Sequence, residues 1–184
     1  MKEALIEFKS VTENKHLVAK PTYEAIINWN GKHTKDDFLV AEINPDYSGG
    51  EDFSSKYNID REIGINCLIA EAKIGNERTF LAMLVPVGYR YNMSKIIRPL
   101  LKAKSVSVAQ LEEILTITNM EYGSINPIGL PKEWIIYIDP LVLFHEKIIV
   151  GSGLKKAKLL IPSIALLEIP SIVILENLAK PIEE

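Results

Sequence analysis

The chain has 184 residues, of which 47% are hydrophobic and 24% are charged, and its net charge is −3 with a pI near 5.7. This is an ordinary globular mixture, and the length suits one domain with or without a terminal extension. The acidic balance argues against a surface that binds nucleic acid everywhere, and it leaves room for a local basic patch. Cys67 is the only cysteine, which excludes an intramolecular disulfide framework and a cysteine-rich zinc site.

Nothing in the sequence indicates a metal, a cofactor or a membrane. The three histidines are far apart and lack metal-ligand spacing. The most apolar stretch, residues 134–149, contains five polar or proline positions, which excludes a span of roughly 20 apolar residues. The polar start of the chain does not resemble a signal peptide, so we expect a reducing, cytoplasmic environment.

The first 37 residues are polar and weakly patterned, and we expect an extension that packs on the main domain, residues 38–184. Apolar residues at helical spacing predict a short first helix over residues 3–8. Pro21 can open a second helix through Trp29, which Asn30 and Gly31 would end.

Short apolar segments separated by turn residues fill the main domain, with helical patterns between groups of strands. This order predicts a mixed α+β domain built on a curved, barrel-like β-sheet with flanking helices. Helices are expected over residues 51–57, 92–102 and 107–115, the last capped by Ser107. Strands are expected over residues 38–43, 63–72, 79–85, 134–138, 147–150, 158–161 and 170–175.

A loop rich in glycine and proline, residues 122–131, separates the last helical pattern from the most apolar run. Glycine adopts backbone angles that other residues avoid, and proline fixes one torsion, so the segment is predicted to be a shaped loop. Its amides from Gly123 to Asn126 can face outward, and amides held in a tight turn bind an anion, a carbonyl or a carboxylate. Spacing alone favours the other interpretation, an ordinary connector.

Three further features have a functional and a plain interpretation. The turn Gly151–Ser152–Gly153 either lets a substrate approach the backbone or is a simple hairpin turn. Asn66, polar in an apolar strand, either faces inward and needs partners or faces solvent. The basic run Lys155, Lys156 and Lys158 forms either a solvated face or a contact for a phosphate backbone.

Candidate nucleophiles and acids are sparse. Cys67 and His145 could supply a thiolate and its base, but no signature supports the pair, and a lone cysteine in a strand is usually a small core residue. Asp139 before Pro140 is a turn signal first, and a binding role for its carboxylate is the minority interpretation.

Residues 123–130 resemble the Gly-x-Ser-Pro-x-Gly loop of the YbaK/ProX-like aminoacyl-tRNA editing domains, also called prolyl-tRNA-synthetase-associated domains. The resemblance covers about residues 38–169 and rests on moderately specific motifs whose order and spacing agree. Residues 65–69 resemble the family's pocket strand. The other matching segments are residues 42–45, 81–86, 93–96, 136–139 and 149–153.

The resemblance implies the fold and an activity, the trans hydrolysis of the ester between a mischarged amino acid and the 3′ end of tRNA. An aminoacyl-tRNA synthetase is a further implied partner. Asn66 would orient the ester or a water, and the amides of Gly123, Ser124, Ile125 and Asn126 would hold the aminoacyl group. A positioned water or tRNA hydroxyl would replace a protein nucleophile. The implied substrate-binding residues are Pro127, Gly129, Asp139, Gly151, Ser152, Gly153 and Lys155.

The sequence departs from the family pattern at three positions. Asn66 replaces the usual pocket lysine, Asn126 replaces the serine before proline, and Lys158 replaces an acidic residue. Asparagine can orient a water or carbonyl but supplies no cation. The departures are compatible with altered substrate choice, with a cation relocated to Lys73 or Lys155, or with a catalytically silent module that binds tRNA, a synthetase or an amino-acid-like ligand.

Overall fold

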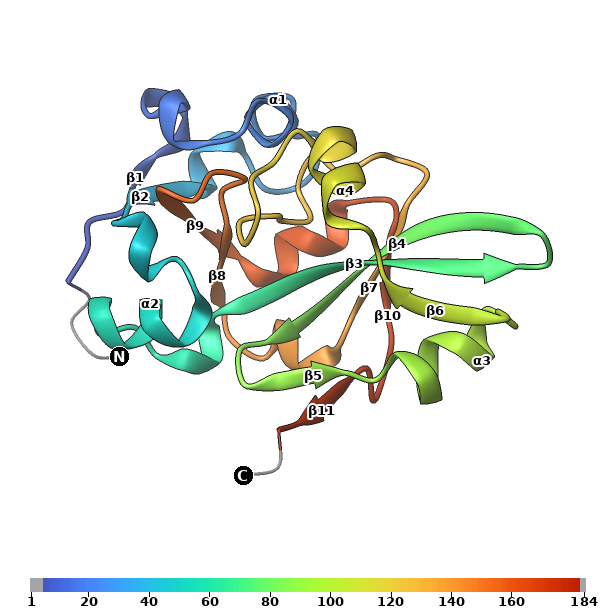
Figure 1. Ribbon diagram of the computed structural model, residues 1–184. Helices are drawn as coiled ribbons and strands as arrows, with labels where there is room; N and C mark the ends of the chain where they lie inside the picture. The colour runs from blue at the N-terminus through green and yellow to red at the C-terminus, as the bar shows by residue number, and fades with distance from the viewer. Residues whose placement is uncertain (1–4, 183–184) are drawn as a thin grey trace.

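The computed structural model describes residues 5–182, which form a mixed α+β fold (Figure 1). The α-helices are α1 (Lys20–Ile27), α2 (Gly50–Tyr57), α3 (Arg98–Leu100) and α4 (Leu111–Thr118). The strands are β1 (Lys9–Ser10), β2 (Leu39–Glu42), β3 (Ile65–Ile74), β4 (Glu77–Pro86), β5 (Tyr89–Tyr91), β6 (Ser105–Val108), β7 (Ile135–Ile138), β8 (Lys147–Gly151), β9 (Ala157–Pro162), β10 (Ile172–Ile174) and β11 (Ala179–Pro181).

Short helical turns complete the fold, and several of them join strands. The 3-10 turns are η1 (Val11–Glu13), η2 (Lys15–Leu17), η3 (Lys35–Asp37), η4 (Pro45–Tyr47), η5 (Arg61–Ile63), η7 (Pro140–Leu143) and η8 (Ser163–Glu168). A π-helical turn, η6 (Met93–Ile97), leads into α3. Across residues 5–182, no helix combines the length and the apolar character needed to cross a bilayer.

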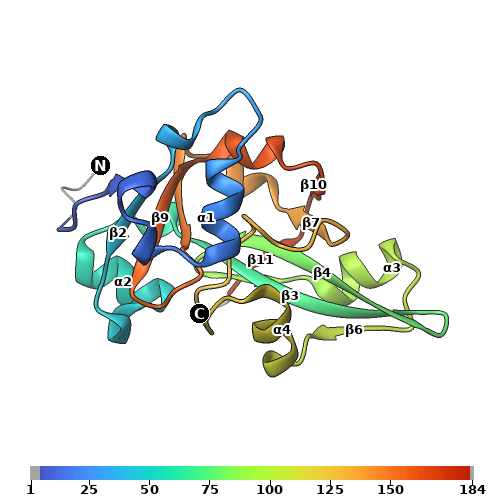
Figure 2. The ribbon, with the colours of Figure 1, turned by 90° about the horizontal axis from the view of Figure 1, so that it is seen from above.

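The central sheet has the strand order β10-β7-β4-β3-β6 and mixes parallel with antiparallel pairs. Strands β3 and β4 form a long antiparallel hairpin that projects from the body of the molecule (Figures 1 and 2). Gly75 makes its turn with a positive φ of 62°. Strand β7 lies parallel to both β4 and β10, and β6 pairs with the outer half of β3.

A second sheet has the order β1-β2-β9-β8 and is antiparallel throughout. A parallel bridge between Gly64 and Ile149 joins it to the start of β3. A two-stranded ribbon, β11-β5, lies beside these sheets. The largest hydrophobic cluster takes side chains from both large sheets, for example Ile69, Leu84, Ile138 and Leu159. The α+β prediction is therefore confirmed.

The N-terminal segment packs on the main sheets, and it contains one of the two helices predicted for it. Helix α1 confirms the second predicted helix, and its Ile26 belongs to the largest hydrophobic cluster. The first predicted helix is wrong over residues 5–8, which have no helical structure, and residues 1–4 lie outside the described residues. Leu5 instead donates its amide to the Tyr57 carbonyl (2.9 Å), and Ile6 and Phe8 pack against α2. Tertiary contacts outweigh the weak helical spacing here.

One further difference from the prediction also arises from pairing with a distant segment. The helix predicted from Ser107 begins only at Leu111, because Ser105–Val108 pair with residues 70–73 of β3 as an edge strand. The alternating Ser-Val-Ser-Val pattern has the period of a strand. Residues 140–143 form a 3-10 turn that the Asp139 carboxylate caps.

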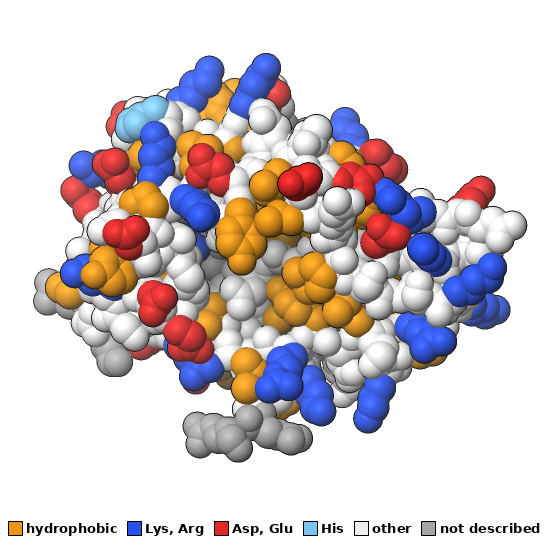
Figure 3. All heavy atoms as spheres, viewed as in Figure 1, with side chains coloured by type: hydrophobic (Ala, Val, Ile, Leu, Met, Phe, Trp, Pro, Cys, Tyr) orange, Lys and Arg blue, Asp and Glu red, His pale blue; other side chains and the backbone are white. Residues whose placement is uncertain are grey.

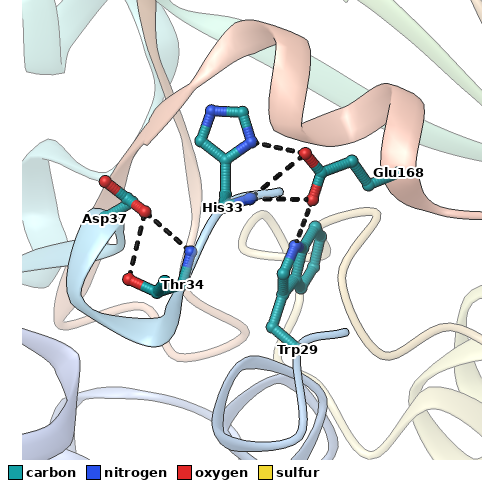
Figure 4. A network of polar contacts seen from close by, with 5 residues as sticks. All are labelled: Trp29, His33, Thr34, Asp37 and Glu168. Atoms are coloured by element: carbon teal, nitrogen blue, oxygen red, sulfur yellow. Dashed lines mark hydrogen bonds and ion pairs between the residues drawn. The ribbon is translucent and has the colours of Figure 1, made fainter. Parts of the chain in front are cut away.

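A polar network fastens the segment after α1 to η8 (Figure 4). Glu168 accepts a hydrogen bond from the Trp29 indole (2.7 Å), and it pairs with Nδ1 of His33 at 2.6 Å. Burial by itself would raise the pKa of Glu168, but the hydrogen bonds from Trp29 and His33 outweigh it and lower the pKa. The ionised carboxylate is thus the form that the fold stabilises.

Replacing Glu168 by glutamine should lower the free energy of unfolding at pH 7 by about 1–2 kcal/mol, because charge-assisted hydrogen bonds are lost. A lowered carboxyl pKa contributes stability above the ordinary value of 4.5, and that stability disappears as the pH falls through the folded-state pKa. Urea unfolding of both proteins at pH 7 and pH 3 measures this. A stability difference that is as large at pH 3 as at pH 7 would contradict the assignment.

Candidate active site

A cavity of about 420 Å³ opens between the central sheet, α2, α4 and the loop after α4. Figure 3 shows a hollow in the middle of this face with hydrophobic side chains on its borders. The wall is mostly apolar and has a few polar groups at distinct places. The lining residues used below are Gly49, Gly50, Ile65, Asn66, Cys67, Tyr91, Tyr122, Gly123, Ile125, Gly151 and Lys158.

The loop reaches the cavity through a tight turn. The Ser124 amide donates to the Glu121 carbonyl (3.1 Å), and Gly123 occupies the third position of the turn with φ at 75°. That position of a type II turn requires a positive φ, which glycine adopts without steric cost. A Cβ on Gly123 would meet no atom within 4 Å, so the residue borders open space. Within residues 5–182, the amides of Gly123 and Ile125 have no acceptor, which leaves two donors beside the cavity.

Behind the cavity wall, buried polar contacts hold the loop in place. The Asn126 side chain is fully buried, donates to the Thr22 hydroxyl (3.0 Å) and accepts from the Ile128 amide (2.8 Å). Thr22, from α1, in turn donates to the Ile128 carbonyl (2.9 Å). Asn126 therefore shapes the loop from behind, while its neighbours Gly123 and Ile125 line the cavity.

The loop also contacts the end of β8. The Gly153 amide donates to the Ser124 carbonyl (2.8 Å), and a Cβ on Gly151 would collide with that carbonyl. Ser124 is 1% exposed, and its hydroxyl has no hydrogen-bond partner within the described part of the chain. Of the predicted glycine turn, only Gly151 lines the cavity, whereas Gly153 packs against Ala19.

Asn66 lies on β3 opposite Val85 and lines the cavity with an exposed side chain. Its side-chain amide makes no hydrogen bond to any residue from 5 to 182. Both interpretations offered by the sequence hold in part, because Asn66 is in the cavity and solvent reaches it. The amide can therefore donate to or accept from a ligand or a water.

Lys158 is the cation among the residues that line this cavity, a place that could not be read from the sequence alone. It pairs with Gly151 on one side and with Ala41 on the other. Its side chain is buried, with the residue 8% exposed, and Nζ lies 5.6 Å from the centroid of the Phe53 ring. Burial lowers the pKa of Lys158 to about 8. The available signal was a single charge inside an apolar strand.

The family model of the aminoacyl-tRNA editing domain matches residues 45–169. The chain belongs to the aminoacyl-tRNA editing domain family. The resemblance predicted from the loop and its flanking segments is thereby confirmed. No curated protein sequence is similar enough to this chain to count as a match.

Solved structures show the same fold at low sequence identity. A proposed trans-editing enzyme for prolyl tRNA synthetase superposes with a TM-score of 0.68 at 15% identity, over 85% of this chain and 95% of that protein. The hypothetical protein APE2540 superposes with a TM-score of 0.67 at 18% identity, over 78% of this chain and 91% of the other. A computationally designed epitope scaffold superposes with a TM-score of 0.69 at 15% identity, over 86% of this chain and 97% of that protein.

Of the other residues predicted for the site of this editing domain, all but Lys155 lie away from the cavity. Pro127 and Gly129 line a separate hollow of about 470 Å³ beside Trp29 and Glu168. Asp139 is buried, and its two oxygens accept from the amides of Leu141 and Ala179. Ser152 is buried, and its hydroxyl donates to the Leu154 carbonyl. Lys155 lies at the rim, with its Nζ 5.2 Å from the centroid of the Tyr122 ring.

The thiol and the histidine considered as a dyad are in different places. Cys67 lines the cavity, whereas His145 borders another hollow and lies 3.7 Å from Glu62. Burial raises the pKa of the Cys67 thiol to about 12. Burial also raises the pKa of Tyr91 in the same wall, and the neighbouring thiol adds to that shift. Neither group is ionised near neutral pH.

Replacing Asn126 by alanine should lower the free energy of unfolding by roughly 1–3 kcal/mol, because the buried Ile128 amide loses its acceptor. Thermal and urea unfolding measure the loss. Asn30→Ala is an informative control, since this exposed asparagine is not at a positive-φ position and its replacement leaves the buried contacts intact. A stability loss at Asn126 no larger than at a surface position would show that the network contributes little.

Cys67 in the native protein should be alkylated by iodoacetamide at pH 8 at least about a hundredfold more slowly than in the urea-unfolded chain, because so little thiolate is present. Mass spectrometry of timed samples gives both rates. Rapid alkylation that also abolishes activity would instead support a thiol mechanism.

Proposed function

We propose that this editing domain hydrolyses the ester between a mischarged amino acid and the 3′-terminal ribose of tRNA, acting in trans. The observation that carries the proposal is the pair of unpaired amide donors, at Gly123 and Ile125, beside an open cavity. Preorganised amides stabilise the oxyanion that forms when an ester carbonyl is attacked. Family membership supports the same chemistry.

The nucleophile in this proposal is water or a tRNA hydroxyl. With water, attack on the carbonyl carbon and cleavage of the bond to the ribose oxygen release the amino acid, while the ribose oxygen takes a proton. Asn66 orients the water or the carbonyl, and the Gly123 and Ile125 amides hold the oxyanion. Cys67 remains a protonated wall residue.

The exposed rim supplies contacts for the tRNA end. Tyr122 is 60% exposed and lies under Lys155, so an aromatic face and a cation stand together at the mouth. Such a pair suits a stacked base and its phosphate. Gly151 lines the cavity, so the backbone of β8 borders the place proposed for the terminal adenosine.

A catalytically silent module that binds tRNA, a synthetase or an amino-acid-like ligand is the alternative. One observation favours it, because no aspartate, glutamate or histidine of the described chain lines the cavity. Asn66 also leaves β3 without a charge at the pocket position. Restoring the lysine with Asn66→Lys separates the two functions, since a gain of deacylation would indicate that the natural protein only binds.

The direct test is amino-acid release from a panel of correctly and incorrectly charged tRNAs, with Gly123→Ala as the diagnostic variant. We expect hydrolysis of a mischarged species and a loss of roughly tenfold or more in the variant, because a side chain is strained at this φ and displaces the amide donors. Asn66→Ala should lower the same rate.

Gly75→Ala is the matched control, because Gly75 also has a positive φ and open space around it but lies at the hairpin turn. Its backbone strain is similar and its turnover should be unchanged. Unchanged turnover in Gly123→Ala would refute the role of the loop. No hydrolysis across the panel, with tRNA still retained on a filter, would establish the binding module.

A further inference from the structure

Lys158 is a buried cation for which the described chain provides no anion. It is 8% exposed, and none of the ion pairs or hydrogen bonds within residues 5–182 involves its side chain. The contact with the Phe53 ring compensates only part of the cost of desolvating an ammonium group. Since a buried charge is normally paired, the missing partner is expected from a ligand in the cavity that Lys158 lines.

The N-terminus of α2 adds positive potential to the same part of the cavity. Gly49 and Gly50 line it, and no side chain caps the helix at Gly49. The first amides of a helix carry a partial positive charge. Phe53, which lies beside Nζ of Lys158, belongs to the first turns of this helix. Two acidic residues lie in the first turn of this helix, and both are exposed. Glu51 pairs with Arg61 at 2.7 Å, and the Asp52 carboxylate lies near Gly49.

How deeply each polar side chain lies in the cavity determines which part of an aminoacyl-tRNA could contact Lys158. Asn66 and Tyr122 are exposed at the mouth, whereas Lys158 is buried in the wall. The tRNA body must stay outside a cavity of about 420 Å³, so its phosphates meet the exposed rim. In the orientation of the proposed function, with the ester at the loop amides, the aminoacyl side chain is the part that extends toward the buried end.

We propose that this cavity selects aminoacyl groups that carry a carboxylate, aspartyl or glutamyl, and that Lys158 is the specificity-determining residue. The inference rests on the proposed function for the orientation of the ligand. The carboxylate would form an ion pair with the ammonium and accept from the amides at the start of α2. Asn66 and the Gly123 and Ile125 amides would hold the ester part that every substrate shares.

Direct binding tests this without requiring hydrolysis. The probes are stable amides of 3′-amino-3′-deoxyadenosine that carry aspartyl or asparaginyl groups, which differ in charge and hardly in shape. Calorimetry on the full chain should show the aspartyl probe binding roughly tenfold or more tightly, as expected for a charge-assisted pair in a dry site. Lys158→Met should abolish this preference and leave the binding of the asparaginyl probe within about threefold.

Lys147→Met is the matched control, because Lys147 is an exposed lysine on β8. It should keep the full preference for the aspartyl probe. Lys158→Arg retains the charge and should retain part of the preference, and thermal unfolding verifies that each variant is folded. If both Lys158 variants fail to fold, titration of the wild-type preference with pH decides, since the preference must fall as the pH rises past the lysine pKa.

Three results would overturn the proposal. Wild-type protein that binds both probes equally has no carboxylate site. Equal weakening of both probes in Lys158→Met would place Lys158 against the shared nucleoside. A preference that appears only when the probes carry a 5′-phosphate, and that Lys158→Met removes, would show that the lysine binds phosphate. Because these are binding results, they are independent of a failure of the hydrolysis panel.

Discussion

The candidate site depends on the close approach of the loop after α4 to the end of β8. The Ser124 carbonyl accepts the Gly153 amide at 2.8 Å and occupies the space that a side chain on Gly151 would need. This contact joins the Gly123 turn to the antiparallel sheet that carries Lys158 opposite Gly151. One absent side chain thus permits the loop contact.

The N-terminal segment supports this arrangement from behind. Helix α1 supplies Thr22, whose hydroxyl accepts from the Asn126 side chain and donates to the Ile128 carbonyl. The Ile128 amide donates to the Asn126 side chain, so these buried polar groups behind the loop all have partners. The Glu168 network fastens the residues that follow α1 to η8. The family match covers residues 45–169, and the segment before it supplies contacts to the loop within that range.

The cavity is lined by a positive charge, although the protein as a whole has a net charge of −3. Its lining has one buried cation and, among the described residues, no acidic side chain. The only cysteine is held as a thiol by burial, and the tyrosine beside it is held as a phenol. The wall therefore offers donors and a positive charge, which suits binding of carbonyl oxygens and anions better than attack by a protein nucleophile.

Local patterns were sufficient for much of the fold. Strand periodicity, which acts over a few residues, predicted the β3–β4 hairpin and the strands near residues 135–138, 147–151 and 157–162. Glycine and proline chemistry, which is equally local, predicted the turn at Gly123. The order of these segments was also enough to identify the family. The same local rules failed at residues 5–8 and 105–108, where pairing with distant segments decided the structure.

The direction and burial of single side chains could be decided only by the tertiary structure. Asn126 points away from the cavity because Thr22, which is 104 positions earlier, supplies its partner. In the sequence, Lys158 belongs to a basic run that could form a solvated face, but in the structure it lies between β2 and β8 and is buried. Asp139 is also buried, and it accepts hydrogen bonds from the Leu141 and Ala179 amides. The sequence by itself determined the elements, the shaped loop and the family. Which polar groups face the cavity depended on contacts between distant residues, because burial and pairing are properties of the packed chain.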